Sequence, residues 1–333
     1  MIPLTRANRP FDPEASSSQP TVSVIIPTYN RASLVQEAIA SVLRNSYSDY
    51  ELIVADDGSK DETAPCLVKQ GFFLFEEKSL QEGKGAVPPA SPSNRILLKL
   101  SHSGYPGRVR NRGALLARGT YLAFLDSDDL WLPKKLEQQL SAHRLAEQEG
   151  KPYRISHTRE LWIREGKQVS QRKQKHQREG DVFTDSLRKC ILGPSTVVLS
   201  RSLWVETGGF REDLEIAEDY EFWIRITTTE PVLYIPEPLT IKRAGWGDQL
   251  SEAYGYIEPF RLTALKDLVE NGFFEEYPGR KLEAVKELIR KCRIHLAGCK
   301  KRGKTEEATQ WEQTLQKYIG IYDTLQIEGK KNP

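Results

Sequence analysis

The acidic residues of this 333-residue chain gather most densely at Asp126, Asp128 and Asp129, directly after the apolar run of residues 121–125. Carboxylates this close together repel one another unless a cation or strong hydrogen-bond donors compensate their charge. Mg²⁺ and Mn²⁺ prefer oxygen ligands, and they commonly bind one or two carboxylates, water and the phosphates of a substrate. The segment therefore predicts a Mg²⁺ or Mn²⁺ site that binds a substrate diphosphate.

Two further acidic pairs stand at comparable places in the sequence. Asp56 and Asp57 follow residues 51–55, an expected strand with four apolar residues at its end, and Glu218 and Asp219 open a segment with helical spacing. Ligands of α/β proteins bind at the carboxyl ends of parallel strands, so we expect the three acidic segments to converge on one cleft. The alternative is that each acid caps a turn or a helix start, where Asp and Glu are also common.

The elements that would position these acids alternate between strands and helices. Short runs of β-branched and other apolar residues indicate buried strands, and three-to-four spacing of apolar residues indicates helices. The alternation predicts an α/β fold with parallel strands and right-handed crossovers. The expected strands of the first half are residues 22–26, 51–55, 95–100 and 121–125, and the expected helices are 31–44, 61–70, 110–117 and 130–149.

The second half of the chain is less regular. Residues 76–94 already break the alternation with glycines and prolines, which indicates a loop insertion. We expect a flexible tail over residues 1–20, an α/β domain over 21–245 and a helical region over 246–333. The elements expected after residue 150 are strands within 155–169, a basic loop at 171–179, a strand at 196–200, helices from 201 and over 218–228, a last strand at 232–235 and helices from 260 onward.

Composition and cysteine pattern exclude several classes of protein. The chain has 48 Lys+Arg against 46 Asp+Glu, a net charge of +2, so its overall charge does not favour nucleic acid. Its apolar stretches are too short for a spanning helix or a signal core. This predicts a cytoplasmic protein, with peripheral contact at the inner membrane face as the alternative. Cys292, Cys299 and His295 are spaced for one helix face, a weak metal signal, and the five histidines are assigned no role.

Five segments occur in a fixed order along the chain: Val22 to Arg31, Asp56 to Ser59, Arg110 to Gly119, Phe124 to Trp131 and Glu218 to Trp223. Together they resemble family-2 glycosyltransferases of the GT-A fold. The resemblance covers about residues 21–243 and implies a Rossmann-like mixed sheet flanked by helices. It also implies a nucleotide-sugar donor, most often a UDP-sugar, a bound Mg²⁺ or Mn²⁺, and a hydroxyl acceptor on a glycan, a lipid-linked molecule or a small molecule.

The resemblance implies a nucleobase site at the ends of the first two strands. Pro27, Thr28 and Tyr29 would flank the base, and the ring of Tyr29 would offer it a flat face. The acid after the second strand would accept a hydrogen bond from the base. Asp57 is preferred for this role, and Asp56 stays open.

The resemblance also assigns roles around the acidic segment. Asp126 would lie near the ribose, Asp128 would bind the metal ion, and Asp129 would assist through water. Arg110 and Arg112 stand just before the preceding strand, where the family often has a residue near the nucleotide. The alternative for these two arginines is a surface position or pairing with an acid.

Asp219 matches the acid that serves as general base in the resembling family. It would deprotonate the acceptor hydroxyl during a single displacement that inverts the anomeric carbon. Glu218, Ser195 and Trp246 are candidates for contacts with the donor or the acceptor. Asp248 stands where many relatives have His, so the part played by that late loop stays open.

Two other functions compete with a glycosyltransferase. A non-catalytic nucleotide-sugar-binding or scaffold protein of the same fold would keep the architecture without turnover. A Mg²⁺-dependent nucleotidyltransferase would share the acidic metal site, but it usually has a glycine-rich first loop that residues 27–31 do not resemble. The oligomeric state and the identity of the sugar stay open.

Overall fold

The computed structural model describes residues 19–80, 94–171, 178–244 and 255–331. The chain divides into two compact units. The first contains Met1–Gly180, Gly193–Glu215 and Pro231–Trp246, and the second contains Asp181–Leu192, Ile216–Glu230 and Gly247–Pro333. The domain boundary expected at residue 245 stays a prediction.

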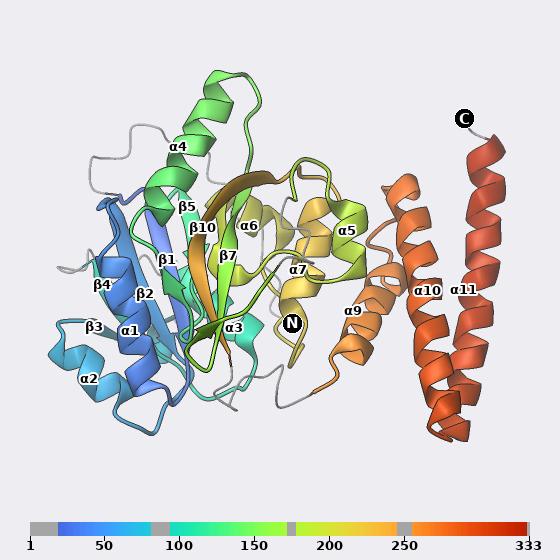
Figure 1. Cartoon of the computed structure of the whole chain (residues 1–333), viewed down its shortest axis with the longest axis horizontal. Coiled ribbons are helices and arrows are strands. Elements are labelled where there is room, and N and C mark those ends of the chain that lie inside the picture. The colour runs from blue at the N-terminus through green and yellow to red at the C-terminus, as the bar shows by residue number, and fades with distance from the viewer. Residues whose placement is uncertain (1–18, 81–93, 172–177, 245–254, 332–333) are drawn as a thin grey trace. The chain divides into compact units, whose positions relative to one another are not determined.

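The first unit is built on a ten-stranded mixed sheet (Figure 1). Its order is β3-β4-β2-β1-β5-β9-β7-β10-β6, and β8 pairs with β7. The strands from β3 to β5 run parallel to their neighbours, whereas β9 is antiparallel to both β5 and β7. The strands are β1 (Val22–Thr28), β2 (Tyr50–Asp56), β3 (Phe73–Glu76), β4 (Arg95–Lys99), β5 (Tyr121–Phe124), β6 (Leu130–Trp131), β7 (Ile155–Arg164), β8 (Lys167–Gln168), β9 (Val197–Ser200) and β10 (Leu233–Ala244).

Helices cover both faces of the β1 region, which explains the unbroken apolar sequence of β1. Val24 and Ile26 pack in a core with residues of α1 and α4, while Gly113 of α3 lies against Ile25 on the other face. The helices of this unit are α1 (Ala32–Leu43), α2 (Thr63–Lys69), α3 (Pro106–Leu115), α4 (Lys135–Gln148) and α6 (Arg201–Thr207), with 3₁₀ turns η1 (Glu77–Leu80) and η2 (Pro194–Thr196).

The structure corrects two of the expected elements. Leu130 and Trp131 do not begin a helix: they form β6, antiparallel to β10, and α4 starts only after Pro133. The last strand, expected at residues 232–235, is longer than expected: β10 continues to Ala244. Its pairing with β7 shifts register around Pro238, because proline cannot donate a hydrogen bond to the neighbouring strand. Of the expected insertion, residues 77–80 form η1, and residues 81–93 lie outside the described part of the chain.

Gly119 allows the turn before β5 to lie directly on β1. A Cβ atom there would come within 2.6 Å of the Ser23 backbone nitrogen and 2.7 Å of the Val22 carbonyl carbon. We therefore expect Gly119→Ala to destabilise the protein by about 1–3 kcal/mol, because backbone atoms would have to move. Urea unfolding measures this, with Gly279→Ala as the control, since among the described residues no heavy atom beyond its chain neighbours and its own helix backbone lies within 4 Å of a Cβ there. Equal stability of the two variants would contradict the prediction.

The second unit consists of helices in its described part. They are α5 (Phe183–Arg188), α7 (Glu218–Thr227), α9 (Glu258–Glu270), α10 (Pro278–Lys301) and α11 (Thr305–Lys331). Val285 and Leu288 of α10 are fully buried, and Leu265 of α9 is fully buried as well. The helices α10 and α11, orange and red in Figure 1, form an antiparallel pair.

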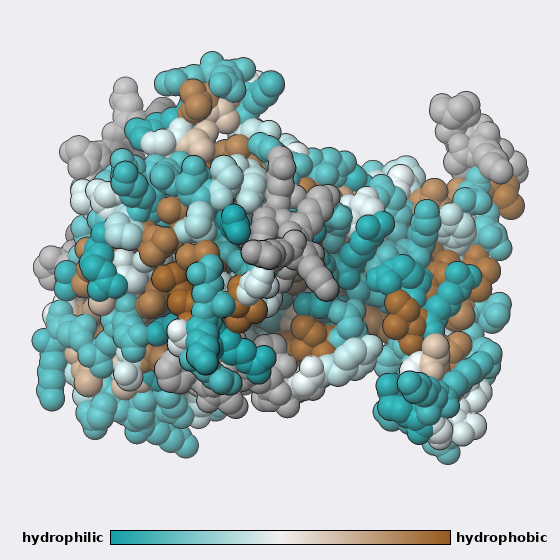
Figure 2. Space-filling model, viewed as in Figure 1, coloured by the Kyte–Doolittle hydropathy of each residue, from teal (hydrophilic) through white to brown (hydrophobic). Residues whose placement is uncertain are grey.

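Hydrophilic side chains dominate the molecular face in Figure 2, where hydrophobic residues appear in separate groups. Among the described residues, no helix combines the length and the apolar character needed to cross a membrane.

Candidate functional site

The sheet brings two of the three acidic segments to one edge. Strand β1 lies between β2 and β5, and all three run parallel. Thr28 at the end of β1 is paired in register with Asp56 at the end of β2. The acidic turn that follows β5 begins at the same end of the sheet. The chain therefore places the expected nucleobase residues and the expected metal ligands on neighbouring strand ends.

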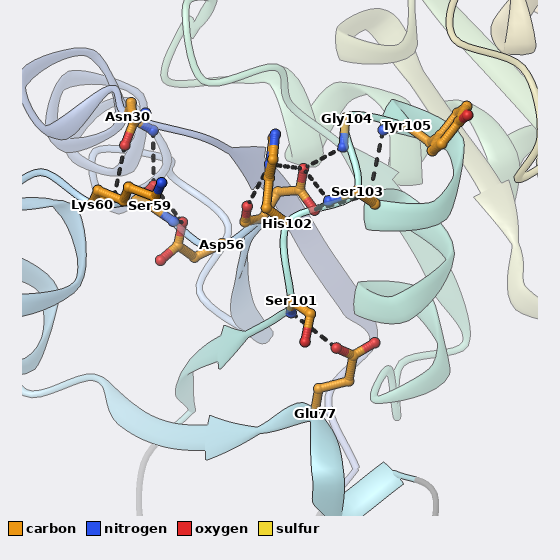
Figure 3. Close-up of polar contacts among 11 residues, drawn as sticks. Asn30, Asp56, Ser59, Lys60, Glu77, Ser101, His102, Ser103, Gly104 and Tyr105 are labelled. Atoms are coloured by element: carbon orange, nitrogen blue, oxygen red, sulfur yellow. Dashed lines mark hydrogen bonds and ion pairs between the residues drawn. The ribbon is translucent and has the colours of Figure 1, made fainter.

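Asp57 anchors the loop that follows β4, and the loop residues His102, Ser103 and Gly104 are labelled in Figure 3. Its carboxylate accepts hydrogen bonds from the backbone N–H groups of Ser103, at 3.0 Å, and Gly104, at 2.9 Å. The Ser103 hydroxyl donates to the same carboxylate at 3.0 Å, and His102 Nδ1 lies 2.9 Å from Oδ2. Gly58 makes this approach feasible, because a Cβ there would come within 2.9 Å of the His102 backbone nitrogen. Asp57 thus holds a preformed loop.

Asp56 holds a neighbouring loop in the same view (Figure 3). Its Oδ1 accepts hydrogen bonds from the backbone and the hydroxyl of Ser59, while Asn30 joins the loop through Ser59 and Lys60. The Oδ2 atom of Asp56 is buried and has no hydrogen-bond partner among the described residues. Burial raises the pKa of Asp56, although the hydrogen bonds from Ser59 act to lower it. A buried acceptor without a hydrogen bond lowers the stability of the protein, so a donor that reaches Oδ2 of Asp56 would form a favourable hydrogen bond.

Two rings form a stacked pair at this edge. The rings of Tyr29 and His102 lie 4.1 Å apart with an interplanar angle of 15°. Tyr29 is 37% exposed, and the His102 side chain is 47% exposed. His102 also pairs with Asp57, so the stack is tied to the loop described above. The pair presents a rigid aromatic surface of the kind on which a nucleobase stacks.

Ser195 ties together the acidic turn after β5. Its hydroxyl donates to Asp129 Oδ2 at 2.7 Å and accepts from the backbone N–H of Asp126 at 3.0 Å. Trp131 Nε1 donates to the Ser195 carbonyl at 2.7 Å. Ser195 itself is 2% exposed. The serine that the sequence offered as a donor or acceptor contact is therefore an internal support of the acidic turn.

Basic side chains from three elements compensate the acidic turn. Arg110 Nη2 of α3 lies 2.7 Å from Asp126 Oδ1, and Arg31 Nη1 lies 3.3 Å from Asp128 Oδ2. The backbone N–H of Arg243 donates to Asp129 Oδ1 at 3.1 Å, and its guanidinium donates to the Asp128 carbonyl. The repulsion inferred from the sequence is thus balanced inside the protein.

The charges of this cluster shift one another's pKa values. Burial and the like charges of Asp128 and Asp126 raise the pKa of Asp129 to about 8, although Lys242 opposes the shift. Burial also acts to raise the pKa of Asp126, but Arg110 and Lys242 hold it below its usual range. Burial acts to lower the pKa of Lys242, but Asp129 and other acids outweigh it and raise that pKa. Lys242 therefore stays a cation beside the acidic turn.

The donor set of the turn fits a hard divalent cation. The side chains of Asp126, Asp128 and Asp129 offer carboxylate oxygens, which are the ligands that Mg²⁺ and Mn²⁺ prefer. Asp128 is 7% exposed and Asp129 1%. Arg31 and Lys242 lie beside the same carboxylates. A diphosphate at this edge would therefore lie near a divalent cation held by the acids and near the positively charged side chains of the protein.

The remaining expected site residues are Arg112, Pro27, Thr28 and Trp246, and only Pro27 and Thr28 are placed at the same sheet edge. Arg112 pairs with Glu77, at 3.8 Å, and with Glu212, at 3.5 Å, so the structure pairs it with acids outside the turn. Pro27 and Thr28 end β1, and Thr28 accepts a backbone hydrogen bond from Asp57 N at 2.9 Å. Trp246 lies outside the described residues.

Glu218 and Asp219 belong to the second unit, where they form the first turn of α7. Ala217 precedes them with a φ of 68°, a left-handed conformation that starts the helix sharply. Asp219 Oδ1 accepts from the backbone N–H of Tyr220 at 2.6 Å, and Oδ2 accepts from the Cys190 thiol at 3.3 Å. Glu218 is 6% exposed, whereas Asp219 is half-buried. Their convergence with the other acids stays a prediction.

Sequence reasoning missed four residues of this edge. His102, Lys242 and Arg243 were given no role, and Arg31 was noted only as the first residue of an expected helix and the last of a resembling segment. A lone His or a pair of basic residues carries little signal, because such residues are usually solvated. The sequence contained only an indirect signal for these basic residues, because three clustered carboxylates need positively charged groups from elsewhere in the chain.

Two family descriptions match most of this region. The model described as "Glycosyl transferase family 2" matches residues 23–151, and the one described as "Glycosyltransferase like family 2" matches residues 94–260. Together these spans include every described residue placed above at the sheet edge, and they include Asp219.

Several known proteins are similar to this chain. A glucosyltransferase of Escherichia coli, WfgD, is 31% identical over 62% of this chain and 69% of its own length. An uncharacterized glycosyltransferase of Rickettsia conorii is 31% identical over 68% of this chain, and the chain spans about a third, 33%, of that protein. The crystal structure of Staphylococcus aureus TarS 1–349 in complex with UDP-GlcNAc has a TM-score of 0.57 at 17% identity, covering 89% of this chain and 92% of that one. This structural likeness shows a shared GT-A fold.

Proposed function

This chain belongs to glycosyltransferase family 2, and from that premise we propose that it is a metal-dependent, inverting glycosyltransferase. It would move a sugar from a UDP-sugar to a hydroxyl group of a glycan or lipid-linked acceptor in cell-surface polysaccharide synthesis. The observation that carries the proposal is the compensated acidic turn of Asp126, Asp128 and Asp129 beside the ring stack of Tyr29 and His102.

The donor site divides into a part for the base and a part for the diphosphate. Tyr29 and His102 would stack on the base, and Asp56 or Asp57 would accept its polar hydrogen. Asp126 would lie by the ribose, and Asp128 would hold Mg²⁺ or Mn²⁺ with help from Asp129. When bound, that ion would offset negative charge on the diphosphate. Lys242 and Arg31 would add fixed positive charge at the same place.

The transfer needs one general base. Asp219 would take the proton of the acceptor hydroxyl while that oxygen attacks the anomeric carbon. The bond from that carbon to the diphosphate oxygen would break on the opposite face, and the nucleoside diphosphate would leave with the electron pair. One displacement inverts the anomeric centre, so no covalent enzyme intermediate is required.

The choice of donor and acceptor rests on the relatives. WfgD is named for a UDP-glucose donor and a diphosphoundecaprenol-linked acceptor, and TarS was crystallised with UDP-GlcNAc. A mannosyltransferase of Pyrobaculum calidifontis, whose fold is similar at a TM-score of 0.51, has a solved structure in complex with GDP-Man and Mn²⁺. These names support a nucleotide-sugar donor and a divalent ion. A lipid-linked acceptor would bring the chain to the inner face of the cytoplasmic membrane.

Calorimetry with UDP, GDP and dTDP, and then with their sugar conjugates, tests the proposal directly. We expect UDP to bind selectively and more tightly with Mn²⁺ than without it. Transfer is then measured by release of UDP in the presence of candidate acceptors. Binding without turnover would favour the non-catalytic scaffold, and no binding of any nucleotide by folded protein would overturn both readings.

Removing the ring of Tyr29 tests the base site. We expect Tyr29→Ala to raise the Kd for UDP about 5- to 100-fold, the usual range for a lost stacking partner, while the effect of Mn²⁺ remains. Phe73→Ala is a matched control, because Phe73 of the edge strand β3 is also an aromatic residue of the first unit with 37% exposure. If both variants bind UDP like the unchanged protein, Tyr29 is not part of the base site.

A further inference from the structure

Three potential metal ligands meet between the last two helices of the second unit. His295 and Cys299 stand four residues apart on α10, and Glu307 lies in the first turn of α11. One ligand atom from each residue lies within 4.8 Å of the other two, and His295 Nε2 is 3.0 Å from Glu307 Oε1. The sequence alone hinted at a metal site on α10, but it lacked the carboxylate that α11 supplies.

Neighbouring side chains fix the orientation of these ligands. The ring of Trp311 packs edge-on against His295, with centroids 4.8 Å apart. Lys304 Nζ donates to Glu307 Oε2 at 2.8 Å, which turns Oε1 toward the imidazole. His295 is 7% exposed and Cys299 is fully buried. Such supporting contacts hold metal ligands ready and tune their affinity.

We propose that His295, Cys299 and Glu307 form a Zn²⁺ site. A thiolate, an imidazole and a carboxylate together select a late transition metal such as Zn²⁺ over Mg²⁺ or Mn²⁺. Bonds of about 2.1–2.3 Å in a tetrahedron separate ligand atoms by roughly 3.5 Å, so small side-chain rotations close the site. The thiol of Cys299 gives its proton to solvent as the Zn–S bond forms.

The fourth position of this site borders a cavity. The cavity has a volume of about 490 Å³, and His295 and Glu307 line it together with Tyr256, Arg302, Lys304 and Trp311. Zn²⁺ sites with three protein ligands keep a fourth position for water or a ligand. The Zn²⁺ site goes beyond the glycosyltransferase proposal and does not depend on it, because its ligands all belong to the second unit, whereas the acidic turn belongs to the first.

Titration of the metal-free 333-residue chain with Co²⁺ tests the proposal. Co²⁺ replaces Zn²⁺ and gives a thiolate-to-metal charge-transfer band that a site made only of carboxylates cannot give. We expect this band to saturate at one Co²⁺ per chain and Zn²⁺ to displace it. Absence of the band in folded protein would overturn the proposal and leave the His295–Glu307 pair as a structural hydrogen bond.

Matched variants identify the ligands. Cys299→Ser should remove the band, and His295→Gln and Glu307→Gln should weaken Zn²⁺ binding at least 10- to 100-fold. Cys292→Ser is the control, because Cys292 is a fully buried thiol on the same helix outside the cluster. A band that persists in Cys299→Ser would overturn the site. Should Cys299→Ser fail to fold, unchanged Zn²⁺ affinity in the His295 and Glu307 variants would overturn it equally.

Discussion

Asp219→Asn is expected to lower kcat by about 100- to 10,000-fold while the Kd for the nucleotide-sugar donor changes little. An amide keeps the size of the side chain but cannot take a proton, and this range is typical of a lost general base. The local structure should survive, because the amide oxygen of Asn can still accept from Tyr220 N, and its NH₂ group can donate to the Cys190 sulfur in place of the present thiol hydrogen bond. Steady-state rates of UDP release with acceptor, set beside calorimetric donor affinity, measure the two effects separately.

Glu218→Gln is the matched comparison, since Glu218 is the adjacent carboxylate in the same turn of α7. Its expected effect on kcat is smaller, because it is 6% exposed and carries no assigned proton transfer. A large loss in Glu218→Gln with near-normal turnover in Asp219→Asn would reassign the base to Glu218. Near-normal turnover in both variants would remove this turn from catalysis.

Asp128→Ala should abolish the part of donor affinity that depends on Mn²⁺ and lower kcat/KM at least 100-fold. The side chain supplies a carboxylate that a divalent ion needs, and lost electrostatic stabilisation of the departing charge commonly costs this much. The expected signature is a Kd for UDP that is the same with and without Mn²⁺. Calorimetry at matched ionic strength measures it.

Asp213→Ala controls for the loss of an acid, because Asp213 belongs to the first unit but is highly exposed and pairs with Arg211. It should leave the Mn²⁺ dependence of binding intact. An unimpaired response to Mn²⁺ in Asp128→Ala would exclude Asp128 as the metal ligand. If the unchanged protein itself shows no Mn²⁺ dependence, the protein's own cations, Lys242 among them, carry the diphosphate and the metal proposal is wrong.

The sequence alone was enough to predict the strands and helices that have a strong local pattern of apolar residues. The expected strands at residues 22–26, 51–55 and 121–125 correspond to β1, β2 and β5, because continuous apolar runs of this length belong to buried parallel strands. The helix expected at residues 31–44 corresponds to α1. Failures occurred where a partner far along the chain decides the outcome: Leu130 and Trp131 become a strand only because β10 pairs with them.

The site could be predicted in part for the same reason. Acidic residues directly after apolar strands can be recognised in the sequence, so Asp56, Asp57 and the acidic turn were predicted. The strand pairing places all of them at one edge of the sheet. Their partners were not found, because Lys242 and Arg243 lie more than a hundred residues after the turn and no local pattern joins them to it. The role of Ser195 as an internal support was equally invisible without its contacts to Asp126 and Asp129.

The pairing of β6 with β10 also constrains how the protein is made. At a synthesis rate of about 5–20 residues per second, the acidic turn leaves the ribosome roughly ten seconds before Lys242 and Arg243 follow. During that interval the first five strands can assemble, and Arg31 and Arg110, which precede the turn, can already pair with Asp128 and Asp126. Asp129 still lacks the backbone N–H of Arg243 and the charge of Lys242. Contacts this distant in sequence also slow folding, because a long loop must close before they form. We therefore expect the acidic turn to gain its last compensating contacts only after β10 has been made.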